Sequence, residues 1–270
     1  MAFTVHAVMP GVWHIVDCMG VCMTLLEGEN AAMLVDTGYG IEDVADFMRH
    51  MTDLPLTVFL THNHHDHAMG ARCFPETYML EADMADWRMF TNDEMRRRVL
   101  TQAIGKNLPV DEKTFLAGEI PLPKVMKPGV IDLGGLTAEI IEAPGHTPGS
   151  AVVYVPERKL LLSGDDWNPC TWLFFPQALG LREYRSNMRG IQQLPFEKVL
   201  CPHRTGAMNQ LITTTGSVCT HPAIRQFALM IRQDSGGINH KFFFQSGFFD
   251  QVKHYSFRRR ATADISEADK

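Results

Sequence analysis

The sequence that decides the fold is Thr61-His62-Asn63-His64-His65-Asp66-His67, in which five of seven side chains can bind a metal through nitrogen or oxygen. These residues follow the apolar, β-branched run Leu56-Thr57-Val58-Phe59-Leu60, which is typical of a buried strand. Ala68-Met69-Gly70 then indicates the start of a helix or turn. Because α/β folds place their ligands beyond the carboxyl ends of strands, we expect the seven residues to form a ligand-binding loop.

The spacing of the donors within this loop favours two metal ions over one. His62 and His64 lie two residues apart, so in an extended segment they point the same way and can share one metal. Asp66 and His67 are adjacent and turn toward a second point. One metal takes three or four ligands from such a loop, whereas this loop offers four or five. A polar surface loop is the alternative, and we expect His65, which points away from His64, not to be a ligand.

The pattern His62-x-His64-x-Asp66-His67 resembles the signature of the metallo-β-lactamase superfamily of hydrolases. Further motifs of this family are found in the same order, each after a strand-like run. They are Leu34-Val35-Asp36-Thr37-Gly38, Gly145-His146-Thr147, Ser163-Gly164-Asp165 and Pro202-His203. The resemblance implies the α+β class and a four-layer αββα sandwich, whereas the pattern alone shows only mixed helices and strands.

The resemblance also implies which residues hold two divalent metal ions. The first set is His62, His64 and His146, the second set is Asp66, His67 and His203, and Asp165 bridges the two. Imidazole and carboxylate ligands without thiolate suit zinc, with iron or manganese as alternatives. Asp36 follows a buried strand, where a carboxylate needs hydrogen bonds, so we expect it to orient the metal loop. A simple turn aspartate before Gly38 is the alternative.

Such a metal pair predicts hydrolysis without a protein nucleophile. Water bound to zinc has its pKa lowered to about 7, against about 15.7 in bulk water. We expect a metal-bound hydroxide to attack a small ester, thioester, lactone or related amide. Asp165, which bridges the metals, and Asp66, which orients the hydroxide, are the predicted catalytic residues. No G-x-S-x-G elbow supports a serine hydrolase.

Residues close to Asp165 and His203 bear on the substrate. The bridging aspartate favours the glyoxalase-II-like branch of the family over its antibiotic-hydrolysing members. Lactonases of the family often carry a tyrosine three residues further on, where this chain has asparagine. Candidate substrate contacts are Trp167, Asn168, Trp172 and Arg204. Core packing of the tryptophans and a solvent-exposed charge at Arg204 are the alternatives.

Length and composition favour one large domain. The chain has 270 residues, of which 45% are hydrophobic, and no linker or internal repeat is evident. We predict a single domain over residues 1–260, with a helical insertion at about 81–128, and a frayed tail over 261–270. Within the predicted domain we expect helices over 41–51, 81–90, 93–104 and 181–191. The insertion either lines a substrate pocket or packs into the core.

Charge and cysteine usage limit the partners. The formal net charge of −6 does not favour nucleic acid, and we interpret the basic run Arg258-Arg259-Arg260 as a solvated strand end. No apolar run is long enough to span a membrane, and the N-terminus lacks a signal-peptide pattern. Six scattered cysteines without a C-x-x-C pair fit a cytoplasmic protein. We expect a small-molecule substrate and no nucleic-acid or membrane partner, and the sequence leaves the oligomeric state open.

Two other functions stay open at this point. Relatives that hold iron reduce oxygen or oxidise sulfur compounds, so an iron-dependent redox enzyme of the same fold is one alternative. A non-catalytic metal-binding sensor is the other. A sensor could lose ligands without harm, whereas this chain retains every position of the motifs.

Overall fold

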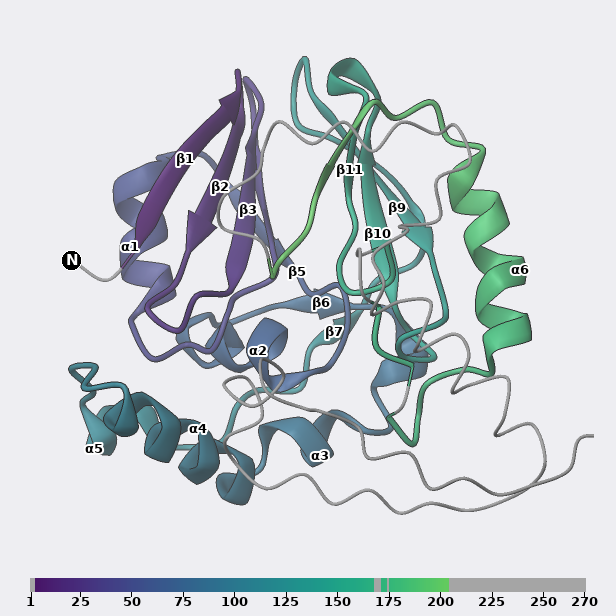
Figure 1. Cartoon of the computed structure of the whole chain (residues 1–270). Coiled ribbons are helices and arrows are strands. Elements are labelled where there is room, and N and C mark those ends of the chain that lie inside the picture. Colours follow the sequence, from purple (N-terminus) through teal and green to yellow (C-terminus); the bar gives the residue numbers. More distant parts are fainter. Residues whose placement is uncertain (1–2, 168–170, 174, 204–270) are drawn as a thin grey trace, which may run out of the picture. The chain divides into compact units, whose positions relative to one another are not determined.

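The computed structural model of this protein describes residues 3–167, 171–173 and 175–203 (Figure 1). The candidate substrate contacts Asn168 and Arg204, the basic run at 258–260 and the tail at 261–270 lie outside the described residues. The predicted limits of a single domain therefore stay a prediction.

The first sheet contains seven strands that follow one another in sequence order. They are β1 (Thr4–Met9), β2 (Val12–Val16), β3 (Cys22–Glu27), β4 (Ala32–Val35), β5 (Leu56–Phe59), β6 (Tyr78–Met79) and β7 (Lys124–Val125). The first four are antiparallel neighbours, and the pairs from β4 to β7 are parallel. Because β4 and β5 are parallel, the residues after both strands, Asp36 and the metal loop, meet at one edge of the sheet.

The second sheet contains five strands in the order β12-β11-β10-β9-β8. They are β8 (Gly129–Asp132), β9 (Thr137–Glu142), β10 (Ala151–Val155), β11 (Leu160–Leu162) and β12 (Lys198–Leu200). The pair β11 and β12 is parallel, and the other pairs are antiparallel. The parallel pair brings Asp165, which follows β11, to the same edge as His203, which follows β12.

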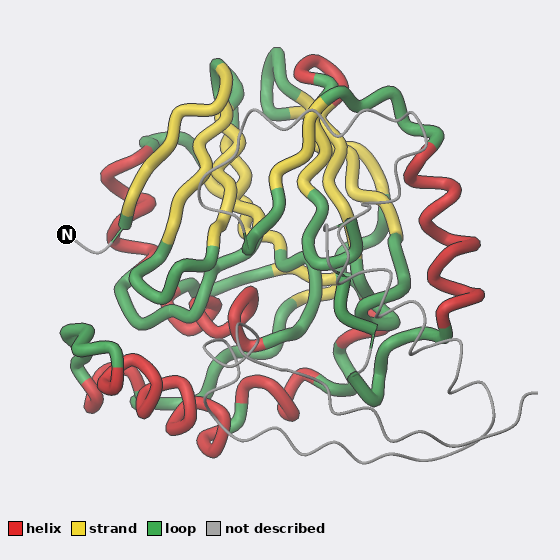
Figure 2. Tube along the Cα trace, in the orientation of Figure 1, coloured by secondary structure: helices red, strands yellow, loops and turns green. Residues whose placement is uncertain are grey.

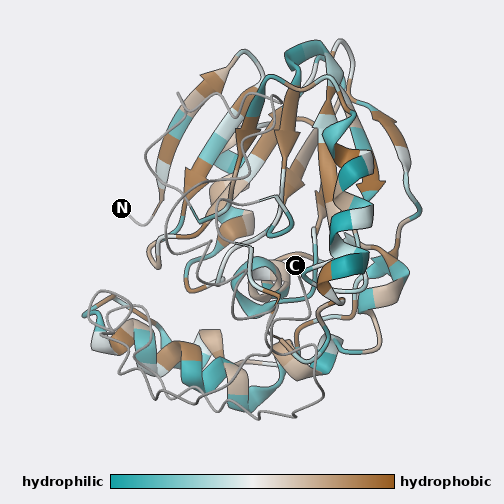
Figure 3. Ribbon diagram, turned by 45° about the vertical axis from the view of Figure 1, so that its right-hand side comes forward, coloured by the Kyte–Doolittle hydropathy of each residue, from teal (hydrophilic) through white to brown (hydrophobic). Residues whose placement is uncertain are grey.

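The main hydrophobic core lies between the two sheets. Met33 and Phe59 of the first sheet share one buried cluster with Val153 and Leu162 of the second. Hydrophobic residues run along the strands of both sheets in Figure 3, where they are brown. Strands buried on both faces explain the nearly continuous apolar runs in the sequence.

Helices cover the outer face of each sheet (Figure 2). Helix α1 (Val44–Met51) packs Val44 and Met48 against the first sheet, and α6 (Leu181–Gln192) packs Met188 and Ile191 against the second. The layers are helix, sheet, sheet and helix, so the predicted αββα sandwich is confirmed. Helix α1 begins three residues later than predicted because the Asp43 side chain caps it, accepting a hydrogen bond from Asp46 N.

The segment predicted as an insertion contains four short or medium helices. They are the 3₁₀ turn η2 (Glu81–Asp83), α3 (Trp87–Thr91), α4 (Asp93–Gly105) and α5 (Glu112–Phe115). The prediction of one helix over 81–90 is wrong, because the Asp83 carboxylate turns inward to hydrogen-bond two other loops. Trp87 and Phe115 pack into a buried cluster with Leu60 and Met69. For these two residues, the insertion therefore packs into the core, which was the alternative to lining a substrate pocket.

Three short elements complete the described chain: α2 (His65–Ala68), η1 (Met69–Cys73) and η3 (Pro156–Arg158). Within the described residues, no helix has the length and apolar character that a membrane crossing requires.

Candidate metal centre

The metal loop runs from the end of β5 into helix α2. Residues 61–64 precede the helix, which begins at His65 and therefore three residues earlier than the sequence indicated. Asp66 and His67 consequently lie on a helical turn, whereas His62 and His64 lie on the preceding segment. This change of backbone direction lets one loop supply donors to two neighbouring points.

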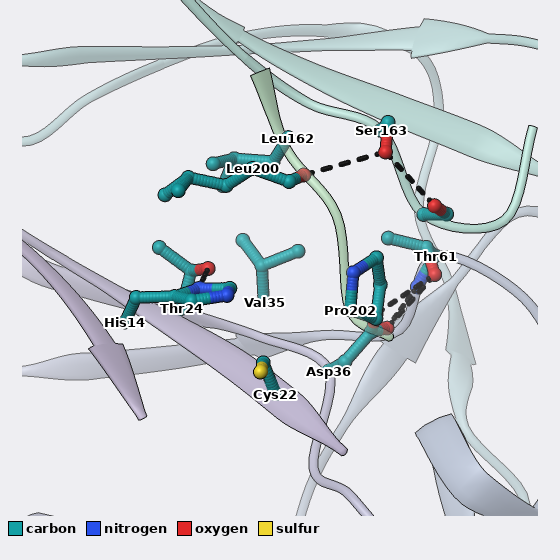
Figure 4. A pocket seen from close by; sticks show the side chains of 11 residues that line it. His14, Cys22, Thr24, Val35, Asp36, Thr61, Leu162, Ser163, Leu200 and Pro202 are labelled. Atoms are coloured by element: carbon teal, nitrogen blue, oxygen red, sulfur yellow. Dashed lines mark hydrogen bonds between the residues drawn. The ribbon is translucent and has the colours of Figure 1, made fainter. Parts of the chain in front are cut away.

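The carboxylate of Asp36 fastens the two ends of this loop. It accepts hydrogen bonds from Thr61 N at 2.7 Å, from Thr61 Oγ1 at 2.9 Å and from His67 Nδ1 at 2.9 Å. Figure 4 shows Asp36 and Thr61 in this arrangement beside a small pocket between the two sheets. Asp36 itself is buried and has a φ of 64°. An aspartate tolerates this left-handed conformation better than most residues, and here the hydrogen bonds hold it.

A close backbone contact holds the other side of the loop. Thr37 N and Thr37 Oγ1 both donate to the His67 carbonyl oxygen, each at 2.8 Å. This approach requires a glycine at position 70, because a Cβ there would collide with the Thr37 carbonyl oxygen. The position of His67 is therefore set by backbone contacts as well as by Asp36.

All seven residues predicted as metal ligands come together at one edge of the sheets. Their donor atoms form three groups within which all atoms lie within 4.8 Å of one another. The groups are His62, His64 and His146; His62, His67 and Asp165; and Asp66, His67 and His203. Asp165 lies between the sets, with carboxylate oxygens 3.4 Å from His146 Nε2 and 3.1 Å from His203 Nε2. His65 belongs to none of these groups.

The orientation of the histidine rings fits metal binding. His62 Nδ1 contacts Thr61 Oγ1 at 3.0 Å, and His67 Nδ1 donates to Asp36, so both rings turn Nε2 toward the centre. Both Nε2 atoms are buried and have no hydrogen-bond partner among the described residues. Buried polar atoms are normally hydrogen-bonded, whereas His67 Nε2 has only the carboxylates of Asp165 and Asp66 at 3.6 and 3.7 Å, beyond hydrogen-bond distance. A metal ion would satisfy both nitrogens.

The two sets of donors differ in their electrostatics. Burial, followed by the neighbouring imidazoles, lowers the pKa of His62 and His64 well below the usual range, so these rings are neutral. Burial also opposes protonation of His67, but Asp165, Asp36 and Asp66 outweigh it and raise its pKa well above the usual range. Burial works against ionisation of Asp66, yet the surrounding histidines lower the pKa of Asp66 to about 2.

Two buried aspartates that the sequence did not single out hold the His146 loop. Asp166 accepts a hydrogen bond from His146 N at 2.8 Å. Asp83 accepts from Thr147 Oγ1 at 2.7 Å and from Gly149 N at 2.6 Å, and also from Asn63 N at 3.1 Å. The Asp165-Asp166 doublet was a local signal that a second carboxylate lies here. Asp83 had no such signal, because its partners are 20 to 66 residues away.

Aromatic rings border the first donor set. The rings of Phe90 and Phe175 lie 4.5 and 4.8 Å from the His64 ring, and Trp172 lies 6.3 Å from Phe175. The structure places Trp167 differently, edge-on against Phe196 in the cluster beneath α6, which is the core-packing alternative. Trp172 also contributes its carbonyl oxygen, which accepts a hydrogen bond from His146 Nδ1 at 2.6 Å.

Comparison with known proteins identifies the family. The family model of the metallo-β-lactamase superfamily matches residues 16–203. The chain belongs to this superfamily. A curated relative is the acyl-coenzyme A thioesterase MBLAC2 of Gallus gallus, which is 26% identical over 166 residues. The match covers 55% of this chain and 59% of that protein, so the chain spans less than two thirds of the relative.

Solved structures share the fold of this superfamily member. A metallo-β-lactamase family protein from Thermus thermophilus has a TM-score of 0.55 at 19% identity, covering 85% of this chain and 82% of its own. A metallo-β-lactamase from Pontibacter korlensis has a TM-score of 0.56 at 18% identity, covering 80% and 98%. At these identities the similarity establishes the fold only, and any inference about the substrate has to come from the site.

Proposed function

We propose that this protein is a two-metal hydrolase that cleaves a carboxylic thioester. The observation that carries the proposal is the cluster of seven donor residues, in which two buried histidine nitrogens have no hydrogen-bond partner among the described residues. A small ester, lactone or related amide is the nearest alternative substrate, because the same centre would serve any of these carbonyl groups.

The seven residues form two sets of metal ligands. The first set is His62, His64 and His146, and the second set is Asp66, His67 and His203. Asp165 is grouped with His62 of the first set and His67 of the second, and we propose that it bridges the two metals. Divalent metals bound there would lower the pKa of a water molecule to about 7 and polarise a carbonyl oxygen. Zinc suits this donor set best, and iron or manganese fit the carboxylates of the second set.

The side chains around the metals have roles of their own. Asp66 Oδ2 lies 3.5 Å from His203 Nε2 and 3.7 Å from His67 Nε2, and we propose that the carboxylate orients the attacking water by accepting a hydrogen bond from it. Phe90 and Phe175 form an apolar surface beside His64. We propose that this surface packs against the acyl group and keeps bulk water away from the reacting carbonyl.

The choice of a thioester rests on the curated relative, whose name assigns it acyl-coenzyme A as substrate. A thiolate leaves readily without a proton, so this reaction needs no general acid. The partner that we expect is thus a small molecule with an acyl group and a thiol leaving group.

The test measures thiol and acid release at pH 7–8 by zinc-loaded protein from thioesters, simple esters, lactones and β-lactams. Asp165→Asn serves as the blank. We expect thioester hydrolysis by the wild type, and a loss in the variant greater than the 10–100-fold that removal of an outer partner typically costs. Metal content is measured alongside and should fall with activity. Full activity of Asp165→Asn with two metals bound would contradict the proposal, as would wild-type protein that holds two metals and releases no acid from any substrate.

A further inference from the structure

Gln177 contacts His64 on the side of the ring that faces away from the other donors. Gln177 Nε2 lies 2.9 Å from His64 Nε2, while His64 Nδ1 lies 2.8 Å from His146 Nε2. The other amide atom, Gln177 Oε1, is buried and has no hydrogen-bond partner among the described residues. A buried oxygen without a donor costs about 1–3 kcal/mol, so this amide is satisfied on one side only.

In this arrangement the side chains form a chain of hydrogen bonds that occupies the imidazole nitrogens needed to bind a metal. Gln177 Nε2 donates to His64 Nε2, His64 Nδ1 donates to His146 Nε2, and His146 Nδ1 donates to the Trp172 carbonyl oxygen. His64 Nδ1 carries a proton in this chain, so it has no lone pair for a metal.

Turning the Gln177 amide by 180° gives the opposite arrangement. This turn exchanges the positions of the amide nitrogen and oxygen, so no other atom has to move. His64 Nε2 then carries the proton and donates it to Gln177 Oε1, and the amide nitrogen takes the buried position that has no partner among the described residues. His64 Nδ1 and His146 Nε2 are both left with lone pairs that face each other at 2.8 Å. Two lone pairs at this distance repel each other unless a cation joins them.

We propose that Gln177 is a positioning residue of the metal centre, whose amide turns with the tautomer of His64 and whose Oε1 fixes the tautomer that binds metal. This inference rests on the metal-binding part of the proposed function and is independent of the substrate. Gln177 can satisfy His64 both without metal, by donating, and with metal, by accepting. A carboxylate or a hydrophobic side chain could do only one of these or neither.

The backbone around Gln177 holds it against the centre. Leu179 N donates to the Gly145 carbonyl oxygen at 2.8 Å, next to His146, and Ala178 N donates to the Phe175 carbonyl oxygen at 3.0 Å. The Phe175 ring also lies 5.5 Å from the His146 ring. This segment therefore reaches both His64 and His146, and it sets the orientation of two of the three histidines in the first set.

The experiment compares Gln177→Met, which keeps the size of the side chain but cannot hydrogen-bond, with Gln177→Glu, which can only accept. Gln192→Met on the exposed end of α6 is the matched control. Zinc affinity is measured by competition with a chelator, and the tautomer of His64 by ¹⁵N NMR of the imidazole rings. We expect Gln177→Met to bind one of the two zinc ions about 10–100-fold more weakly, the usual effect of losing a partner of a metal-binding histidine. Gln177→Glu should bind zinc at least as tightly as the wild type, because a carboxylate partner makes an imidazole more basic, and its His64 should hold the Nε2 proton even without zinc.

Two outcomes separate this inference from the proposed function. Wild-type protein that binds no metal would overturn the proposed function and this inference with it. Wild-type protein that binds two zinc ions, together with a Gln177→Met variant of equal affinity and unchanged His64 tautomer, would overturn the inference alone. A metal-free Gln177→Glu variant whose His64 is protonated on Nδ1 would also contradict it.

Discussion

The two donor sets of this centre differ in the groups that form hydrogen bonds with their histidine rings. In the first set, His146 donates to the neutral carbonyl group of Trp172, and His64 is paired with the neutral amide of Gln177. In the second set, His67 donates to the buried carboxylate of Asp36. A carboxylate partner makes an imidazole more basic and a stronger ligand, whereas a neutral partner mainly fixes its orientation.

This difference indicates that the two metals of the proposed centre would bind for different reasons. The second set combines Asp66 and Asp165 with the charge of Asp36, so attraction between opposite charges favours a divalent cation there. The first set offers three imidazoles and shares only Asp165, so its affinity depends on how well the rings are oriented. We infer that the second set loads first and that the first set is the more sensitive to small displacements.

Replacing Asp36 by Asn should have the largest effect that leaves all seven ligands in place. The Asn oxygen can still accept from Thr61 N, but its amide nitrogen would face His67 Nδ1, so two donors would oppose each other. We expect zinc affinity of the second set to fall by about 100-fold, the upper end for such partners. Zinc titration followed by chelator competition measures this. Asp53→Asn, an exposed aspartate, is the control. Loss confined to the first set would refute our comparison.

Replacing Asp83 by Asn should affect the first set instead, and by less. Asp83 ties Asn63, which lies between two ligands, to Thr147 and Gly149 beside His146. In the variant the oxygen that accepts from Gly149 N is kept, but an amide nitrogen replaces Oδ2, which accepts from both Asn63 N and Thr147 Oγ1, and Asn63 N is left without an acceptor. A buried donor without a partner costs about 1–3 kcal/mol of the free energy of unfolding.

Urea unfolding and zinc titration of Asp83→Asn together give the answer. We expect a loss of stability of about 1–3 kcal/mol and roughly tenfold weaker zinc binding, at the first set only, as for other outer partners. Asp53→Asn again serves as the control. If both metals weakened equally, Asp83 would support the fold as a whole and not the first set.

Much of the fold followed from local patterns in the sequence. Strand-like runs marked β5, β9, β11 and β12, and each predicted ligand followed one of these runs. The carboxyl ends of neighbouring parallel strands meet at one edge of a sheet, which places Asp165 beside His203 and Asp36 beside the metal loop. His146 follows β9, whose neighbours are antiparallel. The motifs alone therefore located the donors, and the contacts between strands brought them together.

The supporting residues could not be found in the same way. Gln177 is 113 residues from His64, and Asp83 is 66 residues from Gly149, so neither contact leaves a local pattern. Residues 81–90 had the composition of a helix, yet the buried hydrogen bonds of Asp83 end the turn η2 at that residue. Long-range hydrogen bonds overrode the local preference there, and only the three-dimensional structure shows them.

The smallest effect is expected at His65, the one histidine of the metal loop outside every donor group. It lies on the first turn of α2, its Nδ1 is 3.8 Å from Asp66 Oδ1, and its ring lies 5.5 Å from that of Tyr39. His65→Gln should change zinc affinity by less than about threefold and stability by about 0.5 kcal/mol or less, as is usual away from special features. The matched variant His67→Gln, two residues along the same turn, should lose the metal of the second set. Zinc titration of the two variants side by side tests whether position within the loop, and not histidine content, builds the centre, and equal losses would contradict the division of donors described above.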